Sequence, residues 1–156
     1  MIVVSDTSCI SNLLTIGHGH LLNELFGEVI IPPAVGDELL RFHAVLPGFL
    51  KRVAPGDAAL LSRLVVEIDI GEAEAICVAR ELHADRLLID EKHGRAVAVR
   101  EGLAIIGIVG ILVLAKEKSL VPSIRPLLFR LENEAGFRLS QTVKTAALKA
   151  VQATRD

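Results

Sequence analysis

The chain has 156 residues, of which 51% are hydrophobic but only 3% are aromatic, and its formal net charge is −2. This length fits one domain, and without Trp or Tyr the core must consist mainly of aliphatic side chains, as in helices packed on a parallel sheet. The charge excludes a general electrostatic attraction to nucleic acid, and five Phe are too few to hold a nucleic acid mainly by base stacking.

The first half of the chain alternates short apolar runs with helical patterns. In chain order we expect a strand over 2–4, one or two helices over 7–26, a strand over 29–31, a helix from 33 to about 45, a minor strand over 49–53 and a helix from 57 to about 65. Gly17 and Gly19 mark the break inside the first helical region. Pro33 begins the next helix because Pro is tolerated in a first helical turn.

The second half continues the same alternation. It predicts a helix from 71 to about 82, a strand over 86–89, a helix over 91–100, a strand over 104–106, a helix over 109–116 and two helices within 123–153 separated at Gly136. Strands that alternate with helices, with no hairpin signal, favour a parallel βαβ sheet of the α/β class. We therefore predict a single compact domain over 1–156 with a C-terminal helical extension over about 123–153.

Neither a signal peptide nor a membrane span is expected. The N-terminus MIVVSDTS has no basic region and only a four-residue apolar run. The longest apolar stretch, near residues 103–115, is interrupted by Gly107 and Gly110 and is too short to cross a bilayer. Cys9 and Cys77 form no CxxC pair, so we expect buried free thiols in a cytoplasmic protein. Without a signal peptide or a membrane span, we expect no membrane partner.

Four acids occupy corresponding places after apolar runs or in the first turns of the helices that follow. They are Asp6, Glu38, Glu72 and Asp90. In an open α/β sheet such positions gather at the carboxyl edge, where ligands bind. Each acid alone is explained by helix capping or by the helix dipole. Four together repel one another unless a cation intervenes, which points to a divalent-metal site.

Helical phase separates Glu38 from its neighbour Asp37. The expected inward stripe of the helix from Pro33 consists of Val35, Leu39, Phe42, Val45 and Leu46. Glu38 lies four residues before Phe42, at the edge of that stripe, whereas Asp37 points to solvent. Glu38 is therefore the candidate.

The same test selects Glu72 in the segment GEAEAICVARELHAD. Glu72 lies four residues before Ile76 on the expected inward face, and Glu74 and Glu81 fall on the opposite side, where water is their expected partner. A carboxylate on an apolar face is costly unless it is paired or bound to metal.

The strand over 86–89 is followed by two acids, Asp90 and Glu91. Asp90 is better placed at the strand end, so we take Asp90 as the ligand and Glu91 as an accessory acid, although the sequence does not separate the two cleanly. Carboxylate oxygens are the ligands that Mg²⁺ or Mn²⁺ prefers. Such a site can activate water and orient a phosphodiester for in-line attack.

Three cations are candidates for holding a phosphate backbone. Lys92 and Arg95 follow Asp90 within about one turn, and Arg41 lies in the helix that carries Glu38. A solvated surface is the ordinary alternative for each of them.

Four segments together resemble the PIN domain, a metal-dependent nuclease fold of many bacterial and archaeal toxins. In order they are VSDTS, PPAVGDELL, GEAEAICVA and LLIDEKHGRAVA, which cover the first two thirds of the chain. The later segments GIVGILVLAKEKSLV and RPLLFRLENEAGFRLS resemble the DUF3368-type subgroup of small PIN proteins.

The resemblance implies a three-layer α/β/α sandwich with strand order 3-2-1-4-5 and a ribonuclease acting on single-stranded RNA. It implies Asp6, Glu38, Glu72 and Asp90 as metal-binding acids, with Ser8 as an accessory hydroxyl. It further implies a toxin of a toxin-antitoxin pair, a homodimer and a small antitoxin protein that blocks the site. Two positions depart from the family pattern, Ile108 where relatives often have Thr and Glu72 where many toxins have Asp.

The sequence also allows other protein classes. A binding or regulatory module with the same fold and little or no turnover is the main alternative. A phosphatase of the haloacid dehalogenase type also has an Asp after its first strand, but it requires a second Asp where this chain has Ser8. A receiver domain would need a phosphoacceptor Asp after a third strand, and none is evident.

Overall fold

The computed structural model describes residues 1–153, in which a parallel five-stranded sheet has the order β3-β2-β1-β4-β5. The strands are β1 (Val3–Ser5), β2 (Val29–Ile31), β3 (Leu50–Arg52), β4 (Arg86–Leu88) and β5 (Ile105–Ile106). All four neighbouring pairs are parallel. The predicted fold class and strand order are confirmed, and β1 occupies the central position.

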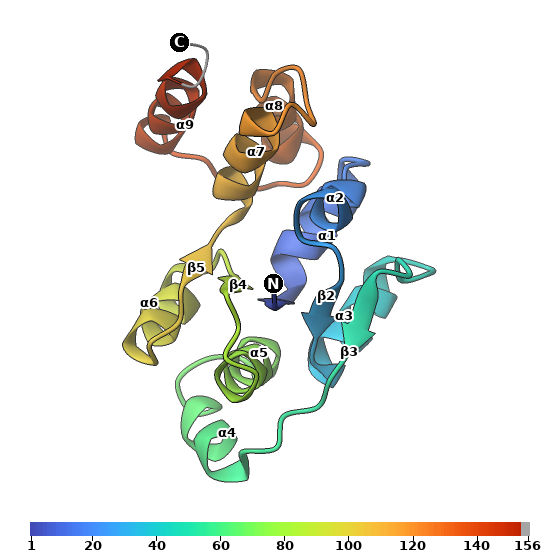
Figure 1. Cartoon of the computed structure of the whole chain (residues 1–156), viewed down its shortest axis with the longest axis vertical. Coiled ribbons are helices and arrows are strands. Elements are labelled where there is room, and N and C mark those ends of the chain that lie inside the picture. Colours follow the sequence, from blue (N-terminus) through green and yellow to red (C-terminus); the bar gives the residue numbers. More distant parts are fainter. Residues whose placement is uncertain (154–156) are drawn as a thin grey trace.

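Helices cover both faces of this sheet. They are α1 (Thr7–Thr15), α2 (His20–Phe26), α3 (Pro33–Phe42), α4 (Ala58–Leu64), α5 (Ile70–Glu81), α6 (Lys92–Arg100), α7 (Ile108–Glu117), α8 (Arg125–Asn133) and α9 (Gln141–Ala153). In Figure 1, α4, α5 and α6 lie to one side of the strands, and α1, α2 and α7 lie to the other. The predicted break in the first helical region corresponds to the turn between α1 and α2, where Gly17 has a φ of 73°.

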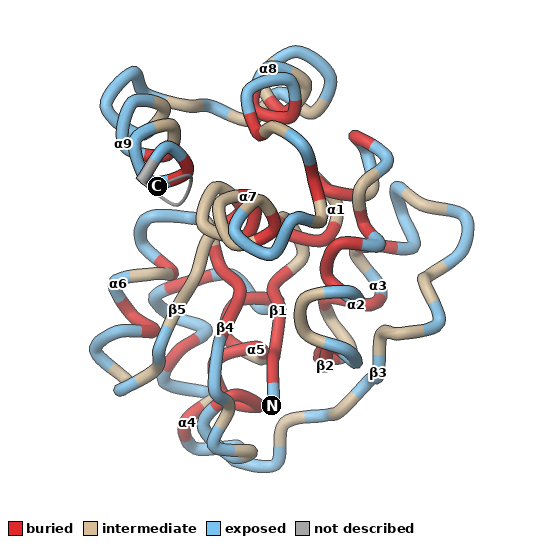
Figure 2. The backbone as a smooth tube through the Cα atoms, turned by 45° about the horizontal axis from the view of Figure 1, so that its top comes forward, coloured by how far each residue is buried: buried red, intermediate tan, exposed pale blue. Residues whose placement is uncertain are grey.

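Alternation along the strands divides the core into two clusters. Val3 belongs to the cluster formed with α1, α2 and α7, whereas its neighbour Val4 belongs to the cluster formed with α4, α5 and α6. In β4, Leu88 and Leu87 are divided in the same way. Because successive side chains in a strand point to opposite faces, both faces of the sheet are buried, and β1 and β4 run through the buried centre of Figure 2.

The C-terminal helices extend the first of these clusters. Leu127 and Leu131 of α8 and Ala147 and Val151 of α9 are buried in it. The tail is therefore packed against the α7 side of the sheet. Within the described chain, no helix combines the length and apolar character needed to cross a membrane.

The expected stripe of α3 is wrong at Phe42 and Val45, whereas Leu46 is partly buried against the core. Phe42 and Val45 are 74% and 79% exposed. The reason is that α3 ends at Phe42, where His43 adopts an extended backbone with φ −131° and ψ 131°. A chain that leaves the helix there no longer presents residue 45 on the helical face that carries Val35.

Candidate metal centre

Three helices begin at one end of the sheet, and each is capped by a carboxylate. Asp6 Oδ1 accepts a hydrogen bond from Cys9 N at 3.1 Å at the start of α1. Asp69 Oδ1 accepts from Glu72 N at 2.9 Å at the start of α5, and Glu91 Oε2 accepts from Gly94 N at 2.8 Å at the start of α6. Capping uses one oxygen of each carboxylate. The positive ends of three helix dipoles therefore lie beside the acids.

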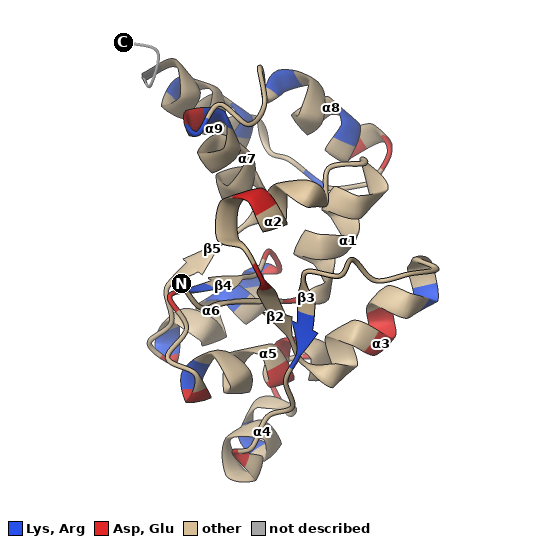
Figure 3. Ribbon diagram, turned by 45° about the vertical axis from the view of Figure 1, so that its right-hand side comes forward, with Lys and Arg blue, Asp and Glu red and all other residues tan. Residues whose placement is uncertain are grey.

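These helix starts surround a pocket of about 340 Å³, closed on another side by α3. Its lining residues are Asp6, Thr7, Ser8, Ser11, Asn12, Glu38, Phe42, Asp69, Glu72 and Glu91. Half of them are acids, and within residues 1–153 no Lys or Arg belongs to the lining. Acidic positions on α3 and α5 are coloured red in Figure 3. The pocket therefore concentrates negative charge without a side-chain cation to balance it.

Asp6 lies at the centre of this arrangement, directly after β1. It is 3% exposed, and burial raises the pKa of its carboxyl to about 7, with a further contribution from the nearby charge of Asp90. The hydrogen bond from Cys9 N opposes that rise. Ser8 Oγ donates to the second carboxylate oxygen, Oδ2, at 3.3 Å. Ser8 therefore contacts the candidate ligand itself.

Glu72 is the second buried acid. It is 7% exposed, and its Oε2 atom is buried without a hydrogen-bond partner among residues 1–153. Burial raises the pKa of its carboxyl to about 8, and the charges of Asp69, Glu91 and Asp6 raise it further. Gly94 of α6 lies against this carboxylate so closely that a methyl group there would overlap Oε2. A buried oxygen with no partner in a pocket of acids is suited to bind a cation.

Glu38 reaches the same pocket from α3. It is half-buried and lines the pocket, whereas Asp37 is exposed and lies 3.5 Å from Arg52 Nη1. Gly71 at the start of α5 allows the close approach, because a Cβ there would lie 3.0 Å from Glu38 Oε1. Helical phase thus placed Glu38 and Asp37 on the sides where the structure has them.

The structure separates Asp90 from Glu91. Asp90 does not line the pocket, and its two oxygens accept from Ile108 N at 2.9 Å and from Cys9 Sγ at 2.9 Å. Asp90 therefore caps α7 from the neighbouring strand end, where Gly107 leaves room for its carboxylate. Burial raises the pKa of Asp90, which lies behind Asp6, while Glu91 lines the pocket.

The side chain of Ile108 does not face the site. It is fully buried in the core cluster on the α7 side of the sheet, and only its backbone N–H contacts Asp90.

The predicted phosphate-binding cations are not brought together. Arg41, Lys92 and Arg95 are absent from the pocket lining. Arg95 Nη1 donates to the carbonyl oxygen of Ile89 at 2.7 Å, which holds its guanidinium at the end of β4. Lys92 and Arg41 are exposed.

Several pocket residues were not predicted from the sequence. Thr7, Ser11, Asn12, Asp69 and Phe42 line the pocket but had no predicted role there. A signal existed for Asp69, because Asp69-x-x-Glu72 has the spacing of a helix capping box. Thr7 Oγ1, like Glu72 Oε2, is a buried oxygen without a hydrogen-bond partner in the described chain.

Glu74 and Glu81 have backbone partners that the sequence did not predict. Glu74 Oε1 accepts from Ala34 N at 3.0 Å and so joins α5 to the start of α3. Glu81 Oε1 accepts from Gly56 N at 2.7 Å and also from Asp57 N, at the start of α4. Both acids satisfy backbone donors of distant segments, which helical phase does not report.

The pocket suits a hard divalent cation by its donors. All the candidate ligands are carboxylates or hydroxyls, the oxygen donors that Mg²⁺ and Mn²⁺ prefer. Within residues 1–153, Glu72 Oε2 is a buried oxygen without a hydrogen-bond partner, and a bound cation would satisfy it. In the part of the chain that is described, no three His, Cys, Asp or Glu side chains already stand as a metal-holding group. The carboxylates would close on an ion when it binds.

Comparison with known proteins agrees with the fold. A family model described as a PIN domain, DUF3368, matches residues 2–153. No curated protein matches the chain.

Proposed function

We propose, from the premise that this chain belongs to the DUF3368 family of PIN domains, that it is a divalent-metal-dependent endoribonuclease. PIN domains are generally nucleases, and this chain has the corresponding sheet. The observation that carries the proposal is Glu72 Oε2, a buried carboxylate oxygen without a partner in a pocket of acids. Burying such an oxygen costs folding free energy unless a ligand binds to it.

Asp6, Glu38 and Glu72 would hold Mg²⁺ or Mn²⁺, with Glu91 as a further carboxylate at the pocket wall. When bound, the metal supplies a polarised water and neutralises the negative charge of the phosphodiester. Asp90 positions Asp6 through Cys9, whose thiol donates to Asp90 and whose backbone N–H donates to Asp6. Ser8 orients the outer oxygen of Asp6.

The substrate must reach an acidic pocket although it is itself an anion. The starts of α1, α5 and α6 meet at the pocket and present backbone N–H groups and positive dipole ends there. Helix N-termini favour phosphate groups for this reason. Lys92 and Arg41 are exposed cations that we assign to the flanking phosphates of the strand. Arg95 is already bound to Ile89 O and has less freedom for that role.

Single-stranded RNA is the proposed substrate, and the proposed setting is the cytoplasmic toxin of a toxin-antitoxin pair. Family resemblance supports both points, as it supports a homodimer and a small antitoxin protein that blocks the pocket. A small open reading frame for a DNA-binding antitoxin directly upstream of the gene would support the toxin assignment. Co-expression of that protein should suppress cleavage by the purified complex.

The decisive variant is Asp6→Asn, because Asn keeps the helix cap while removing the charge. With a fluorescent single-stranded RNA and Mn²⁺, we expect cleavage to fall by at least about 100-fold, since a metal ligand is lost. Asp37→Asn is the matched control, because Asp37 is an exposed acid on the helix that carries Glu38. Cleavage by Asp6→Asn at the wild-type rate would refute the proposed mechanism.

A second candidate is a PIN-fold nucleic-acid-binding or regulatory module without turnover. It is favoured by Asp90, one of the four predicted metal ligands, because its two oxygens already accept hydrogen bonds from Ile108 N and Cys9 Sγ. Calorimetric titration with Mn²⁺ and a panel of RNAs separates the two functions. Metal or RNA binding without any cleavage product would support the binding module.

A further inference from the structure

Phe42 is an aromatic ring at the rim of the acidic pocket. It is the last residue of α3, lines the pocket and remains 74% exposed. The other phenylalanines are placed differently: Phe129 lies on α8 with 66% exposure, and three pack against the core, namely Phe26, Phe49 and Phe137. Phe42 is therefore the aromatic residue of the described chain that meets the candidate metal ligands.

The end of α3 that carries this ring is held in place. His43 N donates to Leu39 O at 2.9 Å and closes the last helical turn. The His43 ring shares a hydrogen bond with Ser11 Oγ at 2.9 Å, which ties the end of α3 to α1. Phe42 thus projects from a fixed helix end into solvent, so its exposure does not result from a loose loop.

The pocket also offers a polar group from α1. Asn12 lines the pocket, and no hydrogen bond joins its side-chain amide to another residue within 1–153. An amide supplies both a donor and an acceptor, as the edge of a nucleobase does. Single-stranded RNA exposes its bases for stacking on aromatic rings and for hydrogen bonding along their edges. The pocket therefore contains a stacking face and an edge-reading group beside its acids.

We infer that Phe42 and Asn12 form a nucleobase subsite, in which the base next to the cleaved phosphate stacks on Phe42 and presents its edge to Asn12. This inference rests on the proposed nuclease function. A protein surface docked on Phe42 is the competing occupant. The shared pocket favours the base, because a phosphate at the acids leaves its neighbouring base at the pocket wall.

A scan of abasic sites tests the subsite. A single-stranded RNA cut at one position is prepared with one base removed at each place around the cut. For the wild type we expect kcat/KM to fall about 5- to 100-fold when one particular base is missing, the range of a lost aromatic stack. Phe42→Ala should lose a similar factor on intact RNA and lose little more on that abasic RNA. Phe129→Ala is the matched control and should behave as the wild type.

Restoration and base choice sharpen the test. Phe42→Trp should retain the wild-type dependence on that base, because the indole also stacks. Asn12→Ala should change the ratio of kcat/KM among the four bases at that position and leave the abasic RNA unaffected. Independent losses, in which the Phe42→Ala and abasic factors multiply, would overturn the subsite.

The subsite can also be tested by binding alone, without RNA cleavage. The same RNAs are titrated by fluorescence anisotropy against the Asp6→Asn protein with and without Phe42→Ala, so that the subsite is measured even if no RNA is cut. Absence of cleavage by the wild-type protein with Mn²⁺, together with a preserved abasic effect on binding, would reject the nuclease function and keep the base subsite. A Phe42→Ala protein that binds every RNA as before but changes oligomeric state in size-exclusion chromatography would overturn the inference and assign the ring to a protein interface.

Discussion

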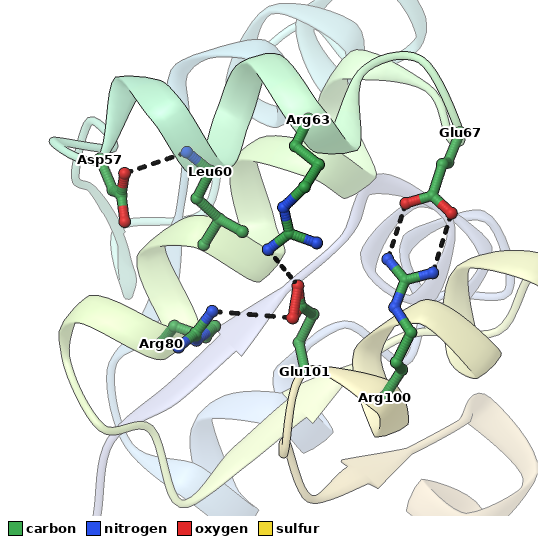
Figure 4. Close-up of polar contacts among 7 residues, drawn as sticks. All are labelled: Asp57, Leu60, Arg63, Glu67, Arg80, Arg100 and Glu101. Atoms are coloured by element: carbon green, nitrogen blue, oxygen red, sulfur yellow. Dashed lines mark hydrogen bonds and ion pairs between the residues drawn. The ribbon is translucent and has the colours of Figure 1, made fainter.

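Two sets of carboxylates lie around α5 and α6, and they are held in opposite ways. Away from the pocket, Glu101 has a side chain only 9% exposed and contacts Arg63 at 2.8 Å and Arg80 at 3.6 Å. Glu67 is bound by both terminal nitrogens of Arg100, at 2.8 and 2.6 Å. Figure 4 shows these pairs linking α4, α5 and the end of α6. We call these two acids the paired acids.

Within residues 1–153, the buried acids of the pocket have no arginine partner of this kind. Burial raises the pKa values of Asp6 and Glu72 to about 7 and about 8, whereas the hydrogen bond from Arg100 lowers the pKa of Glu67. Ordinary folding thus matches acids with arginines in one region and leaves them unmatched in the other. The difference teaches that the pocket acids are retained at a cost to stability, which is typical of a functional site.

The largest expected effect comes from exchanging Glu72 for Gln. The variant should lose at least about 100-fold in cleavage rate, because a metal ligand is removed. At pH 9 without metal, however, its free energy of unfolding should be larger than that of the wild type, because the variant has no charge to bury at this position. Product formation and urea unfolding of the same protein measure the two effects.

Glu101→Gln is the matched change among the paired acids and should act in the opposite direction. It removes two contacts to partly exposed arginines, so stability should fall by about 1 kcal/mol while cleavage is retained. If both variants lost stability at pH 9 and both kept activity, the distinction between the two sets of acids would be wrong.

Gly94→Ala is expected to weaken the site without removing any acid. The added methyl group would displace the Glu72 carboxylate, so the dissociation constant for Mn²⁺ should rise about 10- to 100-fold, as for other changes behind metal ligands. Unfolding free energy should change by less than about 1 kcal/mol, because Ala favours the helix.

Calorimetric titration of Mn²⁺ measures the effect of Gly94→Ala. Gly48→Ala serves as the control, since nothing lies within 4 Å of a Cβ at that position. Unchanged metal affinity in Gly94→Ala would show that Glu72 is not a ligand or does not depend on this contact.

The unfolding free energy should also depend on pH in a direction set by the pocket. Asp6 and Glu72 have pKa values raised to about 7 and about 8, so the folded state holds more protons than the unfolded state between about pH 4 and 8. Stability without metal should therefore fall as pH rises through that window, by an amount on the order of 4 kcal/mol per acid.

Saturating Mg²⁺ should flatten this pH dependence, because the ion replaces the protons. Thermal or urea unfolding at several pH values with and without Mg²⁺ measures it, and Glu72→Gln should remove the upper part of the slope. Stability that rises between pH 5 and 8 without metal would contradict the assignment of buried, unmatched acids.

The smallest effect is expected for Glu67→Gln, which breaks an exposed pair with Arg100. Salt screens such pairs, so we expect the melting temperature to shift by at most about 2 °C and the shift to shrink in 1 M NaCl. Differential scanning fluorimetry at low and high salt is sufficient. A larger shift of the melting temperature that does not depend on salt would show that Glu67 behaves like the buried acids of the pocket.

Much of the fold was predictable because the local signals agreed with one another. Short apolar runs and helical patterns marked the strands and helices, and Gly17 marked the turn between α1 and α2. Helical phase also separated Glu38 from Asp37, since both lie on one regular helix. It failed for Phe42, because the helix ends there and the phase ends with it.

The sequence by itself determined the alternation of strands and helices, the gathering of acids after strand ends and the phase of acids within regular helices. Those features depend on neighbours a few residues apart. Only the tertiary structure decided that Asp90 turns to Ile108 and Cys9, that Gly94 makes room for Glu72 and that Phe42 stands at the pocket rim. Each of these contacts joins segments far apart in the chain, and its geometry follows from how whole helices dock on the sheet.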